Sequence, residues 1–365
     1  MLDKVDLAKP DRRKVVPFNV AIGAVATAVP AFSIGQQELK RRILEYYPQF
    51  AQLESIYGNT GIDRRYYCES QDWYILPRSW EERTAAFQHH ALELLERVTL
   101  AALSEAGLAL EQIDAVVVNT ITGLAIPSLD AMLMNRLGFA AGTERLPIFG
   151  FGCGGGVAGL ARAARIAQTM PGGNVLFLTI DLCTLCMRIN DPSAAAFVAG
   201  ALFGDGAAAV VLRNTLEPGT GDASLGQVVA MGEHLWPGTE YIMGWDIKND
   251  GFGVVLSAEL PNLIQARFGE AVDGFLQRNG LTRADVAGYL LHPGGARVLD
   301  AAERVLGLLP GALEPSRETL RNYGNMSSAT ALFILKYALD TGRRGRHLLA
   351  AFGPGFSAYF VLLDL

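Results

Sequence analysis

The sequence is poor in cysteine, in charge and in long apolar runs, and each shortage excludes a class of protein. Four cysteines in 365 residues are too few for a disulfide scaffold, so we expect a reduced, cytoplasmic protein. Charged residues make up only 19%, and a formal net charge of −6 does not suggest binding to nucleic acid. No apolar run reaches the roughly 20 residues of a membrane span. Residues 1–17 carry charge but no apolar stretch, so a signal peptide is not expected either.

Half of the residues are hydrophobic, and the chain is long enough to bury a sizeable core. Short apolar runs predict strands over Asp114–Thr120, Asn174–Ile180, Ala207–Arg213, Ala287–His292 and His347–Phe352. Helical patterns occur over Arg83–Ala106, Gly156–Gln168, Leu260–Asn279, Gly295–Leu306 and Ser327–Thr341. This alternation indicates an α/β fold in which helices pack on sheets.

A faint internal repeat indicates how these elements are grouped. Gly107 leads into a predicted strand that ends at Asn119, and Gly280 leads, at the same spacing, into one that ends at His292. A second pair of similar stretches follows in the same order, FGDG before AAAVVL and FGPG before FSAYFVLL. We therefore expect two similar α/β halves packed as one body.

The join between the halves is expected in Asn214–Gln227, which is rich in Gly, Ser, Thr, Asp and Pro. On this basis we divide the chain into an N-terminal half over residues 1–220 and a C-terminal half over residues 221–365. A candidate nucleophile lies in the first half, and its candidate partners lie in the second.

Cys153 is that candidate nucleophile, because it lies in a glycine-rich turn between a predicted strand and a long Ala-rich helix. At a helix N-terminus the exposed amides and the helix dipole favour the thiolate over the thiol. The flanking glycines leave room for an acyl group and can direct backbone N–H groups at an oxyanion. The simplest alternative is a small buried cysteine in a tight turn.

The same turn also fits a dinucleotide-binding fingerprint. Gly150, Gly152 and Gly155 match G-x-G-x-x-G between a strand and a helix, and Asp181 ends the next strand. Asp181 follows at a spacing that is somewhat long for the ribose-binding acid, and the motif lies in mid-chain. An NAD(P)-dependent oxidoreductase therefore remains a second possible function.

His292 and Asn325 supply what a cysteine nucleophile needs. His292 ends a predicted strand and precedes a Pro-Gly-Gly turn, which would present its imidazole at the edge of the sheet where α/β sites form. Asn325 lies in a loop just before a predicted helix, where it is either a helix cap or an amide donor to a carbonyl oxygen. With Cys153 these residues form a credible acyl-transfer set.

At these places the sequence resembles the type III polyketide synthases, the chalcone synthase-like branch of the thiolase fold. The matching stretches are GFGCGGGVAGLARA around Cys153, LFGDGAAAVVL, LHPGG, YGNMSSA, FGPG and TGLAIPSLDA. Initiating ketoacyl synthases share the Cys-His-Asn set but fit LHPGG and YGNMSSA less well. The resemblance covers nearly the whole chain and implies a thiolase-like α/β fold with αβαβα layers, in agreement with the repeat.

The resemblance also implies a role for each residue. Cys153 would take a starter acyl group from coenzyme A, and His292 would keep the sulfur as a thiolate–imidazolium pair. His292 and Asn325 would bind the malonyl carbonyl and stabilise the enolate formed on decarboxylation. Acyl-CoA and malonyl-CoA would be the substrates, without a metal or redox cofactor. Ile126 matches a residue that reaches into the partner subunit's cavity, which implies a homodimer.

Further residues are assigned to the cavity and to coenzyme A by the same resemblance. Phe203 matches an aromatic gatekeeper, and Val254 falls where a second gatekeeper aromatic is expected, which implies a roomier cavity. The other cavity residues are Thr122, Asp181, Cys183, Cys186, Ser327 and Pro354. The candidate coenzyme A contacts are Arg64, Arg65, Gly294 and Arg297, because the family's basic contacts look absent near Ser55 and Asn59. Cys183 and Cys186 form a CxxC that alternatively suggests a redox pair or half a metal site.

Within the family, the sequence is most similar to bacterial alkylresorcinol and alkylpyrone synthases, on NTGIDRRYY, DWYILP, the DLC element and MGWDIKNDGFGVVLS. That similarity implies a medium- or long-chain fatty acyl starter, several malonyl extensions by decarboxylative Claisen condensation, and cyclisation to an alkylpyrone or alkylresorcinol. A short or aromatic starter is the alternative within the family. Outside it, the oxidoreductase and a non-catalytic thiolase-fold scaffold remain.

Overall fold

The computed structural model describes residues 18–188, 191, 193–215, 224–249 and 251–365. Nine strands form one sheet in the order β11-β12-β13-β8-β1-β7-β6-β4-β5. Their bounds are Val20–Ala28 (β1), Ala115–Asn119 (β4), Glu144–Ile148 (β5), Asn174–Leu182 (β6), Asp205–Asn214 (β7), Gly226–Leu235 (β8), Gly288–Leu291 (β11), Arg346–Gly353 (β12) and Ser357–Asp364 (β13). The central strands β6 and β7 are almost wholly buried, as expected for continuous apolar runs covered on both faces.

The internal repeat is visible in the way these strands pair. In the N-terminal half β4 pairs with β6 in parallel, β6 with β7 antiparallel, and β7 with β1 antiparallel. In the C-terminal half β11, β12, β13 and β8 repeat this series in the same orientations. The halves join through a short pairing of β1 with β8, at Ala21 with Gln227 and Ile22 with Gly226. The prediction of two similar α/β halves is confirmed.

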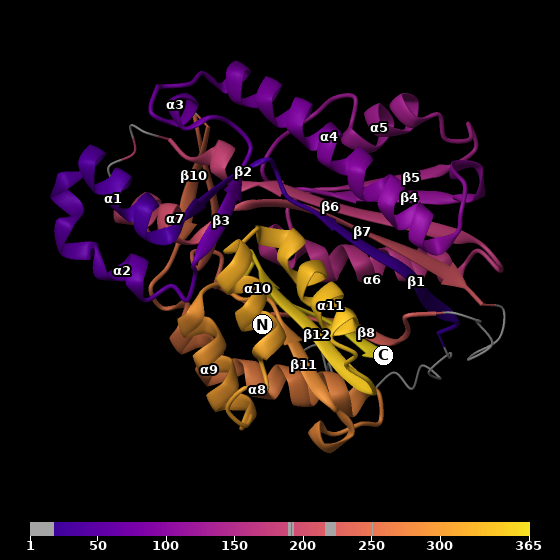
Figure 1. The fold of residues 1–365 in the computed structure, drawn as a ribbon. Coiled ribbons are helices and arrows are strands. Elements are labelled where there is room, and N and C mark those ends of the chain that lie inside the picture. The colour runs from indigo at the N-terminus through magenta and orange to yellow at the C-terminus, as the bar shows by residue number, and fades with distance from the viewer. Residues whose placement is uncertain (1–17, 189–190, 192, 216–223, 250) are drawn as a thin grey trace, which may run out of the picture.

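The helices lie in three layers that alternate with the two halves of the sheet (Figure 1). Their bounds are Gln36–Tyr46 (α1), Ser55–Gly58 (α2), Gln71–Tyr74 (α3), Trp80–Ala106 (α4), Leu129–Leu137 (α5), Gly155–Gln168 (α6), Ala194–Leu202 (α7), Leu260–Arg278 (α8), Ala296–Leu306 (α9), Glu314–Tyr323 (α10) and Thr330–Asp340 (α11). The central core contains α6 and α11 with side chains from both halves of the sheet. A second core lies under α4 and a third under α8 and α9. This is the αβαβα layering of a thiolase-like fold.

The strands and helices predicted from the sequence agree with the structure to within a few residues. The largest differences are an earlier start of α4, at Trp80, and a later start of α11, at Thr330, which the short 3-10 helix Ser327–Ala329 precedes. A capping box between Ser79 and Glu82 begins α4, and Gly107 in a left-handed conformation ends it. Most of the predicted join and the division at residue 220 fall in residues 216–223, outside the described part of the chain. Within that part, no helix is long and apolar enough to cross a membrane.

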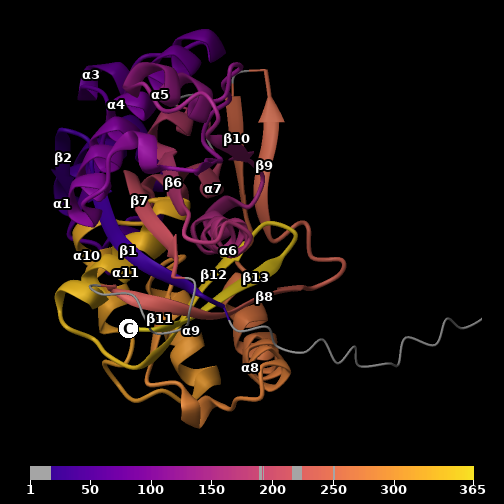
Figure 2. The same cartoon turned by 90° about the vertical axis from the view of Figure 1, so that its right-hand side faces the viewer.

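Two small two-stranded sheets stand outside the large sheet. Phe32–Gly35 (β2) pairs with Arg64–Tyr67 (β3), and Met243–Lys248 (β9) pairs with Gly251–Leu256 (β10). The β9–β10 hairpin rises beside α7 and β6 (Figure 2). It therefore stands over the edge of the sheet where the loops that follow β6 and β11 emerge.

Candidate active site

Cys153 lies on the short 3-10 helix Gly152–Gly154 (η3), which leads directly into α6. Glycine is required beside it. Gly152 has a φ of +51°, and a Cβ there would lie 2.6 Å from Cδ of Pro354. A Cβ on Gly155 would lie 2.4 Å from the Asn119 side chain. The turn thus brings Cys153 to the N-terminus of α6 and close to the loop after β12.

Asn325 is tied by its backbone to the Phe203 loop, residues 202–204. Its N–H donates to Leu202 O, and the N–H of Gly204 donates to Asn325 O, each at 2.9 Å. Its Oδ1 accepts from the N–H of Ser327 at 2.8 Å, which leaves the Nδ2 group as the donor. Ser327 has a φ of +50° and is the one non-glycine residue in the described chain with a positive φ. Strained backbone of this kind is typical of functional sites.

His292 follows β11 and is held at the same edge of the sheet. Its N–H donates to Ala350 O at 2.9 Å, so the strand pairing continues up to the imidazole. The side chain is buried, and neither ring nitrogen has a hydrogen-bond partner among the described residues. The turn that follows packs against the Phe203 loop, since a Cβ on Gly295 would lie 3.4 Å from Cδ2 of Leu202. Loops from both halves therefore converge beside Phe203.

The two titratable groups of this site are neutral when each is considered alone. Burial raises the pKa of the Cys153 thiol to about 12, and hydrogen bonds from Ser327 and Asn325 offset this only partly. Burial lowers the pKa of His292 to about 3. The thiolate–imidazolium pair that the resemblance implies would require each charge to compensate the other. In such a pair, loss of one partner would leave the other neutral.

A cavity of about 80 Å³ opens beside Cys153. Its lining includes six of the expected residues: Phe203, Cys183, Cys186, Val254, Ser327 and Pro354. It also includes Ile121, Met187 and Trp245, which the sequence analysis did not single out. The indole Nε1 of Trp245 donates to Ile121 O at 2.9 Å and fixes β9 over the cavity. Met187 directly follows the CxxC motif, and this position is the sequence signal that could have identified it as a cavity residue.

Asp181 and Thr122 lie beneath this cavity and do not line it, contrary to expectation. The Asp181 carboxylate is fully buried and accepts from the N–H of Ile121 at 2.8 Å and from the N–H and hydroxyl of Ser328. Thr122 donates weakly to Asp181 and accepts from the N–H of Leu182. Both are structural, because the hydrogen bonds of Asp181 hold η6 (Ser327–Ala329) against β6.

This arrangement contradicts a dinucleotide site. The Asp181 carboxylate is engaged inside the protein and cannot bind a ribose. Asn119 fills the space beside Gly155 where a pyrophosphate would approach. Burial also raises the pKa of Cys183 and of Cys186, so the CxxC lacks the lowered pKa of a redox-active cysteine.

The four predicted coenzyme A contacts differ in burial and in their partners. Arg65 is buried and donates through Nη1 to Gly200 O at 2.6 Å and to Phe203 O at 2.7 Å. It therefore fastens β3 to the end of α7, while its Nε and Nη2 have no hydrogen-bond partner among the described residues. Its assignment as a phosphate contact stays a prediction. Arg64 is exposed and stacks over Tyr66, with 5.5 Å to the ring centroid. Arg297 is exposed at the start of α9, where Gly294 is half-buried.

Ile126 lies in the loop before α5 and is 99% exposed. Leu124, in the same loop, and Phe149, in the loop that leads to Cys153, are about half exposed. Isoleucine is usually buried, so an isoleucine that is almost fully exposed in its own chain is unusual. Leu124 and Ile126 follow β4, and Phe149 follows β5, which pairs with β4 in parallel.

Comparison with known proteins agrees with this geometry. The family model for the N-terminal domain of chalcone and stilbene synthases matches residues 75–215, and the model for their C-terminal domain matches residues 227–364. A 1,3,6,8-tetrahydroxynaphthalene synthase of Streptomyces peucetius is 38% identical over 98% of this chain and 97% of its own length. A putative chalcone synthase of Bacillus subtilis is 33% identical over 93% of this chain and 97% of its own.

Solved structures agree as well. The crystal structure of 1,3,6,8-tetrahydroxynaphthalene synthase from Streptomyces coelicolor, a bacterial type III polyketide synthase, is similar with a TM-score of 0.88. It is 30% identical and covers 94% of this chain and 99% of that one. The chain belongs to the chalcone and stilbene synthase family and is a malonyl-CoA-dependent type III polyketide synthase.

Proposed function

We propose that this synthase is primed by a medium- or long-chain fatty acyl-CoA and cyclises its product to an alkylpyrone or alkylresorcinol. The observation that supports this starter is the apolar lining beside Cys153. Cys183, Cys186 and Val254 offer no charge and, at Val254, no aromatic ring to obstruct a hydrocarbon chain. Burying such a chain is favourable by about 0.8 kcal/mol per methylene.

In this proposal the acyl group is first transferred to Cys153. His292 accepts the thiol proton, the thiolate attacks the thioester carbonyl, and the bond to the coenzyme A sulfur breaks. His292 then returns the proton to the departing coenzyme A thiolate. Only coenzyme A thioesters enter the scheme, without a metal or redox cofactor. We place the reaction in the cytoplasm, which fits four cysteines that are all free.

The extension step uses His292 and Asn325 as donors. The Nδ2 group of Asn325 and the imidazole of His292 bind the thioester carbonyl of malonyl-CoA, which loses its carboxylate as CO₂. The resulting enolate is stabilised by these two donors in a water-poor site. Its α-carbon forms a bond to the acyl carbonyl and displaces the Cys153 thiolate. The extended chain then returns to Cys153 for the next round.

We also propose that the enzyme is a homodimer, in which Ile126 of each subunit enters the other subunit. The exposure of Ile126 and its neighbours supports this, because an apolar surface next to an active site is typical of a covered interface. The loop from Thr122 to Ile126 connects this surface to β4, which borders the site.

The names of the relatives favour a second starter, malonyl-CoA itself. Relatives are named 1,3,6,8-tetrahydroxynaphthalene synthase and, in Pseudomonas fluorescens, phloroglucinol synthase. The rings of these products carry oxygen on alternating carbons and no alkyl chain. A synthase that needs no separate starter would produce this pattern from two-carbon units alone.

One assay separates these candidates. The enzyme is incubated with labelled malonyl-CoA, alone or with acyl-CoA starters from acetyl through palmitoyl to aromatic, and products are read by mass spectrometry. Labelled pyrones or resorcinols from fatty starters are expected. Hydroxylated aromatics from malonyl-CoA alone, unchanged when fatty starters are added, would contradict the fatty acyl proposal.

A further inference from the structure

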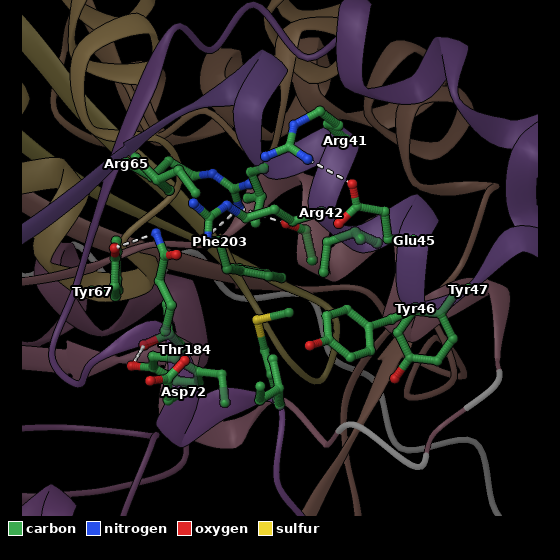
Figure 3. A pocket seen from close by; sticks show the side chains of 18 of the residues that line it. Arg41, Arg42, Glu45, Tyr46, Tyr47, Arg65, Tyr67, Asp72, Thr184 and Phe203 are labelled. Carbon is green, nitrogen blue, oxygen red and sulfur yellow. Dashed lines mark hydrogen bonds and ion pairs between the residues drawn. The ribbon is translucent and has the colours of Figure 1, made fainter.

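A larger cavity of about 390 Å³ lies on the other side of η4 (Cys183–Cys186) from Cys153. It is bordered by α1, β3 and α3 (Figure 3), and we call it the α1 chamber. Met187 and Phe203 line both this chamber and the cavity beside Cys153. The two spaces are therefore neighbours that two side chains separate, and one of these, Met187, is flexible and unbranched.

The interior of the chamber is suited to an apolar guest. Leu39, Ile43 and Ile75 contribute aliphatic surface, and a set of tyrosines contributes ring faces. Several of the polar side chains on these walls bond to one another. The Tyr74 hydroxyl bonds to Thr184 Oγ1 at 2.7 Å, and Gln71 Nε2 donates to the Tyr67 hydroxyl at 3.1 Å.

Four arginines border the chamber, and three of them already have carboxylate partners: Arg41 has Glu38 and Glu45, Arg42 has Glu38, and Arg188 has Asp191. The fourth, Arg65, donates to backbone oxygens, and its Nε and Nη2 have no hydrogen-bond partner among the described residues. The pair of Arg41 with Glu45 is visible in Figure 3. Asp72 adds another carboxylate to the lining. Three of the four arginines are thus paired with carboxylates, and the mainly aliphatic and aromatic walls favour a hydrocarbon as the guest.

The volumes of the two cavities also favour a hydrocarbon chain as the guest of the α1 chamber. A methylene group is similar in size to a water molecule, which takes about 30 Å³ of liquid, so 80 Å³ beside Cys153 holds only a few such groups. The α1 chamber, at about 390 Å³, has room for roughly a dozen. A long chain attached to Cys153 needs such a second space.

We propose that the α1 chamber binds the distal end of the fatty acyl chain carried by Cys153, and that Met187 is the movable wall through which the chain passes. This inference rests on the fatty acyl starter proposed above. Gly200 makes the movement possible, because it lines the chamber and a Cβ there would lie only 3.1 Å from Cε of Met187.

The direct test is a photoreactive starter. Dodecanoyl-CoA with a diazirine at its terminal carbon is incubated with the full-length enzyme, so that Cys153 takes the acyl group and coenzyme A leaves as its thiol. Irradiation then joins the chain end to the nearest residues, and peptide mapping identifies them. We expect crosslinks in α1 and α3, on residues such as Ile43, Tyr46 and Ile75.

The outcomes separate this inference from the function on which it rests. Acylated Cys153 with crosslinks confined to the β9–β10 hairpin, to α4 or to a partner subunit would overturn the α1 chamber and leave fatty acyl priming intact. No acylation of Cys153 by the probe, with products formed from malonyl-CoA alone, would overturn the fatty acyl starter and the chamber with it.

A variant series gives an independent kinetic readout. Ile75→Trp fills the chamber from its rim, where Ile75 is partly exposed, so the change should be tolerated by the fold. We expect the ratio of kcat/KM for dodecanoyl-CoA to that for hexanoyl-CoA to fall more than about tenfold, since each buried methylene contributes roughly fourfold. Leu309→Trp, at a residue 79% exposed and outside the chamber, is the control and should leave the ratio as it is. An unchanged ratio in Ile75→Trp would contradict the chamber.

Discussion

At the scale of single residues, the chemistry depends on two buried groups that are each neutral alone. Burial raises the pKa of Cys153 to about 12 and lowers that of His292 to about 3. The main causes of the shift in the Cys153 pKa include no cation. We therefore expect His292, the imidazole that the family resemblance pairs with Cys153, to be the group on which thiolate formation depends.

This dependence predicts the behaviour of His292→Gln. The variant keeps a donor of similar size but loses the compensating charge, so the pKa of Cys153 should rise. Because the thiolate is the form that alkylates, inactivation by iodoacetamide at pH 7 should slow by at least about tenfold and recover as pH rises. The rate is measured from pH 5 to 10, with Cys153→Ala as the control for other thiols. Identical pH profiles in wild type and His292→Gln would contradict the pairing.

At the scale of elements, the site exists because α6 and η6 are packed closely against each other. A Cβ on Gly156, in the first turn of α6, would lie 2.1 Å from the backbone oxygen of Ser328. Backbone cannot yield as a side-chain end can, so the two elements would have to move apart. They carry Cys153 on one side and Asn325 with Ser327 on the other.

We therefore expect Gly156→Ala to damage stability and activity together. Overpacking of this kind typically costs about 1–3 kcal/mol, and separation of Cys153 from Asn325 should reduce kcat by more than about tenfold. Urea unfolding and product formation measure the two effects. Gly142→Ala is the matched control, because nothing lies within 4 Å of a Cβ there. Equal behaviour of the two variants would show that the close packing is not required.

The η4 element, which separates the α1 chamber from the cavity beside Cys153, is anchored by the buried carboxylate of Asp205. Asp205 accepts from the N–H of Thr184 at 2.8 Å and from the N–H of Cys68 at 3.1 Å. Burial raises its pKa from 3.8 to about 6 in spite of these bonds. The folded protein therefore holds the Asp205 proton more tightly than the unfolded chain does.

The sign of the resulting pH dependence follows from linkage. Below pH 3.8 the group is protonated in both states, and above pH 6 it is charged in both, so its contribution to stability falls as pH rises between these values. The free energy of unfolding of wild type relative to Asp205→Asn should fall by on the order of 3 kcal/mol across this window. Urea unfolding at pH 4 and pH 7 measures it, and a difference that rises with pH would contradict the account.

The elements were predictable from the sequence, but their contacts were only partly so. Long periodic segments such as Arg83–Ala106 have strong patterns, and the repeat that ends at Asn119 and His292 reports a real duplication of the sheet. The surroundings of Asp181 and Arg65 could not be predicted from the sequence, for one reason. Each is a charged residue at an element next to the site, and its burial depends on partners more than 130 positions away, Ser328 and Phe203. The α1 chamber was missed because it forms only when α1, α3 and η4 pack together.

At the scale of the whole molecule, the apolar surface around Ile126 predicts association of two copies. Replacement by a charge, Ile126→Asp, puts a carboxylate where the proposed interface would desolvate it, and the dimer should weaken by more than about tenfold. Sedimentation at several protein concentrations measures this, with Leu309→Asp as the control on an exposed leucine elsewhere. A wild-type protein that is monomeric at every concentration would contradict the homodimer.

The central claim is that Cys153 carries the acyl group, and the mass of the intact protein tests it most directly. After incubation with a fatty acyl-CoA, wild type should gain the mass of one acyl group per subunit, and Cys153→Ala should gain none. Cys153→Ala should form no polyketide yet still decarboxylate malonyl-CoA slowly, since His292 and Asn325 remain. Acylation of Cys153→Ala to the same extent as wild type, or polyketide formation by that variant, would contradict the account.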